Sequence, residues 1–189
     1  KKDKKHDRII FDLSNNQKLI YNDVRKFGFI KFIQRASLEQ NAHLKDLGPE
    51  PMSAKFNIGY FKDYTTGKER NIKNILMDQK FISGLGNIYV NEILFLSGVK
   101  PVKKIKKLTD IEIKKIIKFT KKIISKAIIL GGSSIKDFSS SSGKKGSFQQ
   151  YFNVYGKKGE NCPKVKCKEK IKKIVVSNRA SFFCNKCQK

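Results

Sequence analysis

The chain has 189 residues, of which 42 are lysine or arginine and 16 are aspartate or glutamate, so its formal net charge is +26 at pH 7. Such a charge favours polyanionic partners, and no apolar run is long enough to span a membrane. With 39% hydrophobic residues the chain can bury cores of its own, and its length allows one or two small domains.

The lysines and the arginines carry different information. Abundant lysine, isoleucine and asparagine are what an AT-rich genome produces, so the total charge is a weaker indicator of binding than it looks. Arginine offers a planar fork that lysine cannot replace at a bidentate or stacked site. The five arginines are Arg8, Arg25, Arg35, Arg70 and Arg179.

Residues 8–35 have the pattern of β-strands. Two apolar runs at 8–13 and 18–21 flank the turn-rich SNNQ, which predicts a hairpin. The run DVRKFGFIKFI at 23–33 predicts a further strand with aromatic side chains on a sheet face. Gly28 interrupts that run and indicates a bulge or a close approach of another group.

Residues 36–52 are expected to form a connection, because Pro49 and Pro51 cannot lie inside a helix or a central strand. The pattern then changes to a helical period. Residues 53–64 predict a short helix with Ser53 as its cap.

Three further helices are predicted. Residues 69–81 place apolar side chains on one side of a helix. The next helix is expected to start at an Asn87 cap and to stop at Gly98. The clearest helix covers 109–130, where Thr109 and Glu112 fit a capping box. Its apolar stripe consists of Ile113, Ile116, Ile117, Ile123, Ile124, Ala127 and Ile128.

The stretch from 133 to 146 is a polar loop by composition, and it is either a linker or a segment that closes over a ligand. Strands are predicted to resume in SFQQYFNVYG at 147–156.

Four cysteines lie in two close pairs near the end of the chain. Cys162 and Cys167 are separated by four residues, and Cys184 and Cys187 by two, with 16 residues between the pairs. Two knuckles on a hairpin can supply the four thiolates of a tetrahedral zinc ion, so the spacing predicts a zinc ribbon. Two disulfides, which are typical of secreted proteins, or four free thiols are the alternatives.

Taken in order, six segments make the chain resemble the bacterial formamidopyrimidine-DNA glycosylases, which remove oxidised purines from DNA. These segments are DVRKFG at 23–28, LGPEP at 47–51, ILMDQKFISGLGNIYVNEILF at 75–95, GGSSIKDF at 131–138, GSFQQYFNVYGKKGENC at 146–162 and NRASFFCNKCQ at 178–188. A single GLGNIY would be a weak signal, but six ordered segments ending in the cysteine pairs are specific.

The resemblance implies an α+β multidomain fold, in which the end of a β-sandwich precedes a helix–two-turn–helix α domain and a four-cysteine zinc ribbon hairpin. The expected parts are the last strands of the sandwich at 1–35, a linker at 36–52, the helix–two-turn–helix domain at 53–130, a lesion-recognition loop at 131–150 and the zinc ribbon at 151–189. The implied partner is double-stranded DNA with oxidised bases. The resemblance also implies a monomer that does not associate with a membrane and that acts in the bacterial cytoplasm. One structural Zn2+ is the implied cofactor.

The resemblance also assigns DNA contacts. Phe27 matches the aromatic wedge that enters the base stack when the damaged nucleotide is everted, and Arg25 matches the arginine that binds the widowed cytosine. Asn87 and Arg179 match two residues that hold a backbone phosphate near the lesion, and Lys73 matches a lysine near the site. Residues 139–148 match the segment that folds over the everted base. By alternation alone, Phe27 would instead be a core side chain of a sheet.

The family's nucleophile is an N-terminal proline, whose secondary amine forms a Schiff base with the sugar before β,δ-elimination, and a glutamate beside it does acid–base work. This chain contains no match to either catalytic residue. It starts with a lysine and with its strand pattern already running, so we expect it to be the C-terminal portion of a longer glycosylase and AP lyase, inactive by itself. Its four prolines, all acylated, are Pro49, Pro51, Pro101 and Pro163.

Two alternatives stay open at this point. The chain could be a relative of endonuclease VIII, which shares the fold but prefers oxidised pyrimidines. It could also be a non-catalytic zinc-ribbon protein that binds nucleic acid.

Overall fold

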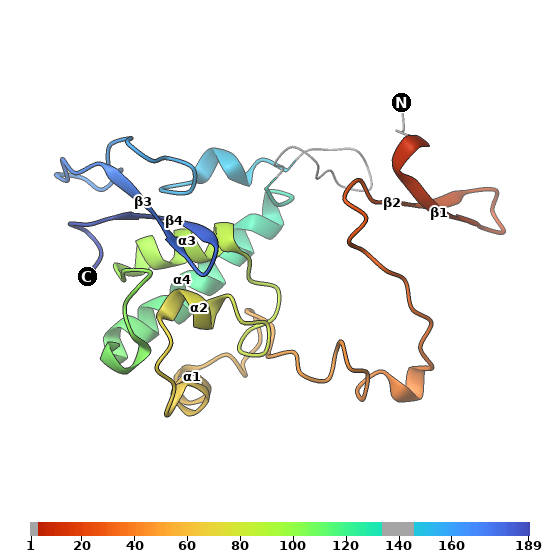
Figure 1. Cartoon of the computed structure of the whole chain (residues 1–189), viewed down its shortest axis with the longest axis horizontal. Coiled ribbons are helices and arrows are strands. Elements are labelled where there is room, and N and C mark those ends of the chain that lie inside the picture. Colours follow the sequence, from red (N-terminus) through yellow and green to blue (C-terminus); the bar gives the residue numbers. More distant parts are fainter. Residues whose placement is uncertain (1–3, 134–145) are drawn as a thin grey trace. The chain divides into compact units, whose positions relative to one another are not determined.

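The computed structural model of the chain describes residues 4–133 and 146–189 (Figure 1). The chain divides into two compact units, Lys1–Gln40 and Asn41–Lys189.

The first unit is built on a β-hairpin. A 3-10 turn at Lys4–His6 precedes β1 (Asp7–Asp12), which pairs antiparallel with β2 (Lys18–Asn22). Ile10 lies opposite Ile20 and Phe11 opposite Leu19 in this register. The hairpin predicted around SNNQ is therefore confirmed.

The further strand predicted at 23–33 is wrong, since the structure has no strand there. The Asp23 carboxylate accepts hydrogen bonds from the backbone amides of Arg25, Lys26 and Gly28 at 2.8 to 2.9 Å. A side chain that takes up neighbouring amides competes with a sheet ladder, so a turn forms in place of the strand. The unit ends in a second 3-10 turn at Arg35–Ser37.

Gly28 marks a close approach, as predicted. A Cβ atom at this position would lie 1.5 Å from the Tyr21 hydroxyl. The turn that follows β2 therefore packs directly on the β2 side chain, and no larger residue fits without moving Tyr21.

The second unit begins with two helices that are shorter than predicted. The helix α1 spans Ile58–Thr65 with Asn57 as its cap, and Ser53 is not the cap because its hydroxyl accepts from the Lys55 amide within a local turn. The helix α2 spans only Ile72–Leu76. Its cap is Asn71, whose side chain accepts from the Asn74 amide.

The prediction of a helix over 69–81 fails at its second half. There, the Asp78 carboxylate accepts from the Lys80 amide at 3.1 Å, and the Gln79 side chain accepts from the Gly84 amide at 2.8 Å. These side-chain bonds stabilise a turn, so the chain leaves the helix soon after Leu76.

The two long helices lie close to the predicted positions. The helix α3 spans Asn87–Ser97 and ends at Gly98, whose φ of 75° is the left-handed conformation that glycine adopts easily. Its cap is Gly86, so Asn87 is the first helical residue and not the cap as predicted. The helix α4 spans Asp110–Ile129 and follows a 3-10 turn at Ile105–Lys107.

The predicted capping box of α4 is present. The Glu112 amide donates to the Thr109 hydroxyl, and the Glu112 carboxylate accepts from the Thr109 amide at 3.0 Å. The pair satisfies two of the amides that a helix start leaves without partners.

The strands predicted at 147–156 are wrong. A 3-10 helix covers Phe148–Tyr151, and no strand follows until β3 (Ile171–Val176), which pairs antiparallel with β4 (Arg179–Cys184). The turn between them has Ser177 and Asn178 at φ of 48° and 57°, as in a two-residue primed hairpin turn.

The core of this unit sits around α3, which contacts both α4 and β4 (Figure 1). Most of its side chains are buried, since it has packed neighbours on more than one side. A second, smaller cluster joins Phe95 of α3 to the hairpin through Val154, Cys162, Ile171, Phe182 and Cys184.

Candidate metal centre and nucleic-acid interface

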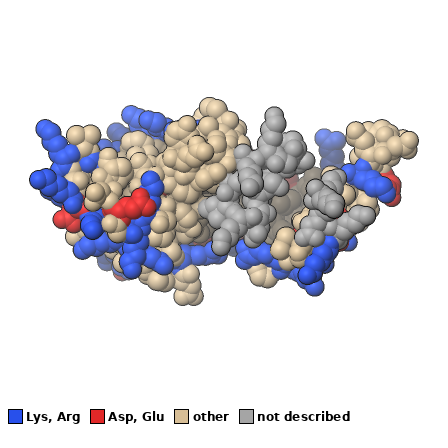
Figure 2. Space-filling view, turned by 90° about the horizontal axis from the view of Figure 1, so that it is seen from above, with Lys and Arg blue, Asp and Glu red and all other residues tan. Residues whose placement is uncertain are grey.

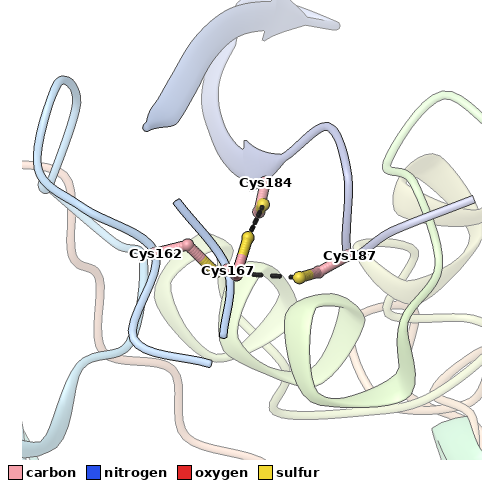
Figure 3. Close-up of side chains that lie close together, drawn as sticks. All are labelled: Cys162, Cys167, Cys184 and Cys187. Atoms are coloured by element: carbon pink, nitrogen blue, oxygen red, sulfur yellow. Dashed lines mark hydrogen bonds between the residues drawn. The ribbon is translucent and has the colours of Figure 1, made fainter. Parts of the chain in front are cut away.

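The four cysteines converge on one point in the second unit. Cys184 ends β4, Cys187 follows it, and Cys162 and Cys167 come from the loop before β3; in Figure 3 their side chains point toward one another. The four sulfur atoms all lie within 4.8 Å of one another.

The geometry of the sulfurs fits a tetrahedral ion. The Sγ atoms of Cys162 and Cys187 are 3.8 Å apart, and those of Cys167 and Cys184 are 3.7 Å apart. Four sulfurs at 2.3 Å from a tetrahedral zinc ion would be separated by about 3.8 Å. The distances are far above the roughly 2 Å of a disulfide, and all four thiols are free.

The buried position of Cys162 favours the neutral thiol, so a metal ion has to be present before it becomes a thiolate ligand. Burial raises the pKa of the Cys162 thiol to about 12. A thiol of that kind binds a metal only as the thiolate, so the ion itself has to displace the proton. The donor set and its spacing are those of a structural zinc ribbon.

The β3–β4 hairpin is fastened to the helices by a shared carbonyl. The Ala180 carbonyl of β4 accepts from the Lys73 ammonium of α2 at 3.0 Å and from the Asn87 side-chain amide of α3 at 3.1 Å. The Lys73 ammonium also donates to the Ser181 hydroxyl at 2.6 Å. We call these residues, together with the adjacent Arg179, the helix–hairpin junction.

The helix–hairpin junction gathers three of the predicted DNA-contacting residues. Lys73 and Asn87 donate to Ala180, and Arg179 is the adjacent residue on the strand, exposed just after the hairpin turn. The sequence places these residues on three separate elements, and the structure brings them together.

Lys73 is buried, with 1% of its surface exposed. Burial and, secondarily, the nearby Arg179 guanidinium lower the pKa of its ammonium from 10.5 to about 8. In the structure its ammonium faces the hairpin backbone, which the sequence does not reveal.

Asn91 is a further residue of the junction that sequence reasoning missed. Its side chain accepts from the Phe182 amide and donates to the Asn87 carbonyl, both at 2.6 Å. Asn91 lies one turn after Asn87 and is 1% exposed. A polar residue inside an otherwise apolar helical run was the available signal, because buried amides need partners.

Glu92 is a second buried polar residue of α3 that sequence reasoning missed, and the same signal, a polar residue inside an apolar helical run, pointed to it. Its buried carboxylate accepts from the Asn153, Val154 and Tyr155 amides and from the Asn153 side chain, at 2.8 to 2.9 Å. A single carboxylate therefore fixes the segment that precedes the cysteines to the middle of α3.

Arg25 and Phe27 belong to the first unit, on the turn organised by Asp23. The Arg25 guanidinium lies 4.8 Å from the centre of the Phe27 ring. Phe27 is 78% exposed, so in this chain it is not a core side chain of a sheet. Hydrogen bonds, first of all from the Gly28 amide, hold the pKa of the Asp23 carboxyl below its usual range.

The segment assigned to the everted base is covered only in part, because residues 139–145 lie outside the described residues. The Phe148 amide, at its end, donates to the carbonyl of Gly132, which precedes the segment, at 3.1 Å. A Cβ atom at Gly146 would lie 2.2 Å from that same carbonyl.

Basic residues form several patches on the surface seen in Figure 2, and acidic residues are fewer there. Such a surface attracts polyanions over a distance. Within residues 4–133 and 146–189, no helix has the length and apolar character needed to cross a membrane.

Known proteins that are similar to the chain in sequence and in structure belong to one family. The profile of the formamidopyrimidine-DNA glycosylase H2TH domain matches residues 47–139. Formamidopyrimidine-DNA glycosylases from Rickettsia massiliae and Rickettsia bellii are each 43% identical to the chain. The matches cover 99% and 98% of this chain and 66% and 67% of those proteins, so the chain spans about two thirds of their length.

Solved structures agree. The MutM (Fpg) protein of Thermus thermophilus superposes with a TM-score of 0.88 at 32% identity, over 97% of this chain and 68% of that one. The Lactococcus lactis Fpg in complex with DNA containing an abasic site gives a TM-score of 0.87 at 36% identity, over 97% of this chain and 66% of that one.

Proposed function

Since the chain belongs to the formamidopyrimidine-DNA glycosylase family, we propose that it supplies the DNA binding and lesion recognition of a base-excision repair enzyme for oxidised purines. The full-length enzyme would remove 8-oxoguanine and formamidopyrimidines through a Schiff base and β,δ-elimination. It would act as a monomer on duplex DNA in the bacterial cytoplasm.

The observation that carries this proposal is the helix–hairpin junction. Asn87 and Arg179 come from α3 and from the zinc hairpin, and the Ala180 carbonyl links the two elements directly. A phosphate held by an amide and a guanidinium is recognised without regard to base sequence, as expected of an enzyme that has to search any duplex.

The cysteine cluster supports a structural role for zinc. We propose that one Zn2+ is held by Cys162, Cys167, Cys184 and Cys187, where it would fix both ends of the β3–β4 hairpin. Zinc supplies folding free energy and no catalytic step at a site with four protein ligands. The consequence for function is that Arg179 depends on the metal for its position.

The turn in the first unit supports two further roles. The exposed Phe27 ring is free to enter a base stack, and the Arg25 guanidinium beside it is placed to bind the base left without a partner. Wedge insertion offsets part of the cost of unstacking, which is on the order of a few kcal/mol.

The proposal is tested with the zinc-loaded chain and duplexes that carry 8-oxoguanine, thymine glycol or no lesion. We expect tighter binding of the 8-oxoguanine duplex. Equal affinity for all three would leave a nucleic-acid-binding role only, and a preference for thymine glycol would indicate specificity of the endonuclease VIII kind.

Catalysis is tested separately by borohydride trapping on the 8-oxoguanine duplex. We propose that the chain alone forms no covalent adduct, because it contains no match to the family's proline nucleophile. A full-length relative is the positive control. An adduct formed by this chain at the control's rate would place the nucleophile within these 189 residues.

A further inference from the structure

A pocket of about 400 Å³ lies between α2 and the turn that joins β3 to β4. Three of the residues that line it are cations, namely Arg70, Lys73 and Arg179, and one is an anion, Asp78. The pocket adjoins the helix–hairpin junction, because Lys73 and Arg179 belong to both.

The single carboxylate of the pocket is already used. Arg70 pairs with Asp78 at 2.6 Å and donates to the Asn74 carbonyl at 3.0 Å, which fixes its guanidinium in the wall. In the part of the chain that the structure describes, neither Lys73 nor Arg179 forms an ion pair with a carboxylate. The pocket therefore carries an excess of two positive charges.

Among these three cations, the charge of Lys73 is the least favourable for the free energy of the folded chain. Its ammonium has three N–H donors, and the acceptors in the structure, Ala180 and Ser181, are both neutral. A buried cation without a counter-charge is unfavourable. Its lowered pKa, about 8, is the expected result of burial and of the neighbouring Arg179. An anion in the pocket would supply the missing counter-charge and so offset the unfavourable effects of burial and of Arg179.

We propose that this pocket binds a second phosphodiester of the DNA backbone, next to the one assigned to Asn87 and Arg179, with Arg70 and Lys73 as its binding residues. The inference rests on the proposed function and extends it by one backbone contact. A strand that passes Asn87 reaches the pocket through Arg179, since Arg179 lines the pocket and precedes Ala180 in the strand.

The proposal has a consequence for proton binding. A phosphate favours the charged form of Lys73, so the pKa of this ammonium is higher in the complex than in the free chain. Below about pH 7 the ammonium is protonated in both states and the affinity does not change. As the pH rises through about 8, the free chain loses the proton first and the affinity falls.

The groups that face Lys73 do not explain such a change by themselves. Asp78, which pairs with Arg70, has a pKa held below its usual range, and Arg179 on β4 is the other charged neighbour. The remaining neighbours, Asn87 and Ser181, do not titrate in this range.

The first experiment measures the affinity for a short duplex as a function of salt concentration, using Arg70→Gln, Lys73→Met and the control Lys118→Met on the exposed face of α4. Each lost phosphate contact lowers the slope of log K against log[salt] by about 0.9. We expect that loss for Arg70→Gln and Lys73→Met but not for the control. Arg70→Lys is expected to restore most of the slope.

The second experiment repeats the affinity measurement between roughly pH 7 and 9, where the wild-type chain should lose affinity and Lys73→Met should not. Zinc content and melting temperature verify that each variant is folded. Unchanged slopes in folded variants, with wild-type binding intact, would overturn the pocket assignment alone. A wild-type chain that fails to bind duplex DNA would overturn the proposed function as well.

A third arm distinguishes DNA from a free anion. Inorganic phosphate could raise the melting temperature of the wild-type chain but not of Lys73→Met, while the wild-type chain and the variants have the same salt slope for DNA. In that case the pocket is a site for small anions. That outcome contradicts a backbone contact. A lower salt slope in both Arg70→Gln and Lys73→Met supports the backbone contact.

Discussion

The two regions that carry the proposed DNA contacts are built in opposite ways. The turn with Arg25 and Phe27 is organised by Asp23, whose three amide partners lie two to five residues away. The helix–hairpin junction joins Asn87 and Lys73 to Ala180, which is 93 and 107 positions away in the chain. The turn depends on its neighbours in sequence, and the junction depends on the packing of the whole second unit.

This difference predicts how each region responds to damage. A change in the turn should alter recognition while the rest of the protein stays folded. A change in the cysteine cluster should affect metal binding, folding and DNA affinity together, and a change in the junction should lower the melting temperature as well as the DNA affinity. Variants in both regions can test this contrast, and their expected effects on DNA binding and recognition decrease in the order Cys184→Ser, Asn87→Ala and Arg179→Ala, Arg25→Ala, Asp23→Asn.

The largest effect is expected from Cys184→Ser. The change removes one of the four metal ligands, and a structural zinc site provides about 10–16 kcal/mol in isolated zinc-finger peptides near neutral pH. We expect loss of bound zinc, unfolding of the hairpin and loss of most DNA affinity. Elemental analysis and circular dichroism measure this. A variant that keeps one zinc per chain would contradict the assigned ligand set.

The next largest effect is expected from Asn87→Ala and Arg179→Ala. A hydrogen bond to a charged group contributes about 1.5–3 kcal/mol, so each change should weaken binding by roughly 10- to 100-fold. The loss should be the same for damaged and undamaged duplexes, because backbone contacts carry no base sequence. Fluorescence anisotropy on both duplexes measures it, and a loss confined to the damaged one would argue against a phosphate contact.

Arg25→Ala is expected to act on the opposite base. The bidentate contact that the guanidinium can make with a base edge is worth about 1–3 kcal/mol of discrimination. In a full-length enzyme that contains this segment, excision opposite cytosine should slow more than excision opposite the other bases. Single-turnover rates with each opposite base measure it. Equal loss in all four duplexes would show that Arg25 acts only through its charge.

Asp23→Asn is the matched test of the turn. An amide oxygen accepts more weakly than a carboxylate, and the lowered pKa of Asp23 shows that the charged form is the one stabilised by the Gly28 amide. We expect a partial loss of the same opposite-base discrimination, with zinc content and melting temperature unchanged. A fall in melting temperature equal to that of a junction variant would remove the contrast between the regions.

The last prediction concerns stability instead of DNA recognition, namely the pH dependence of the free energy of unfolding at Lys73. The pKa is about 8 in the folded chain and about 10.4 when unfolded, so the unfolded state binds more protons between these values. The wild-type chain should therefore gain stability relative to Lys73→Met as the pH rises from roughly 8 to 10. Denaturant unfolding at several pH values measures the difference. A difference that does not vary with pH would show that Lys73 is buried without cost.

Much of the fold follows from short-range rules in the sequence. The capping box of Thr109 and Glu112, the left-handed Gly98 and the first hairpin each depend on residues within one or two turns of the chain. The cysteine spacing likewise predicted which residues would form a cluster. These features were predictable because a cap, a tight turn or a knuckle is decided by its immediate neighbours.

The tertiary structure decided the rest. Asn87 bonds to β4 instead of capping its helix, whereas the absence of the strand predicted at 23–33 is a local effect of Asp23 on the amides of its own turn. The burial of Lys73 and the partners of Asn91 and Glu92 also come from distant segments. Sequence patterns identify the donors and acceptors, but only the packed chain determines which of them meet, because a buried polar group bonds to whatever the fold places beside it.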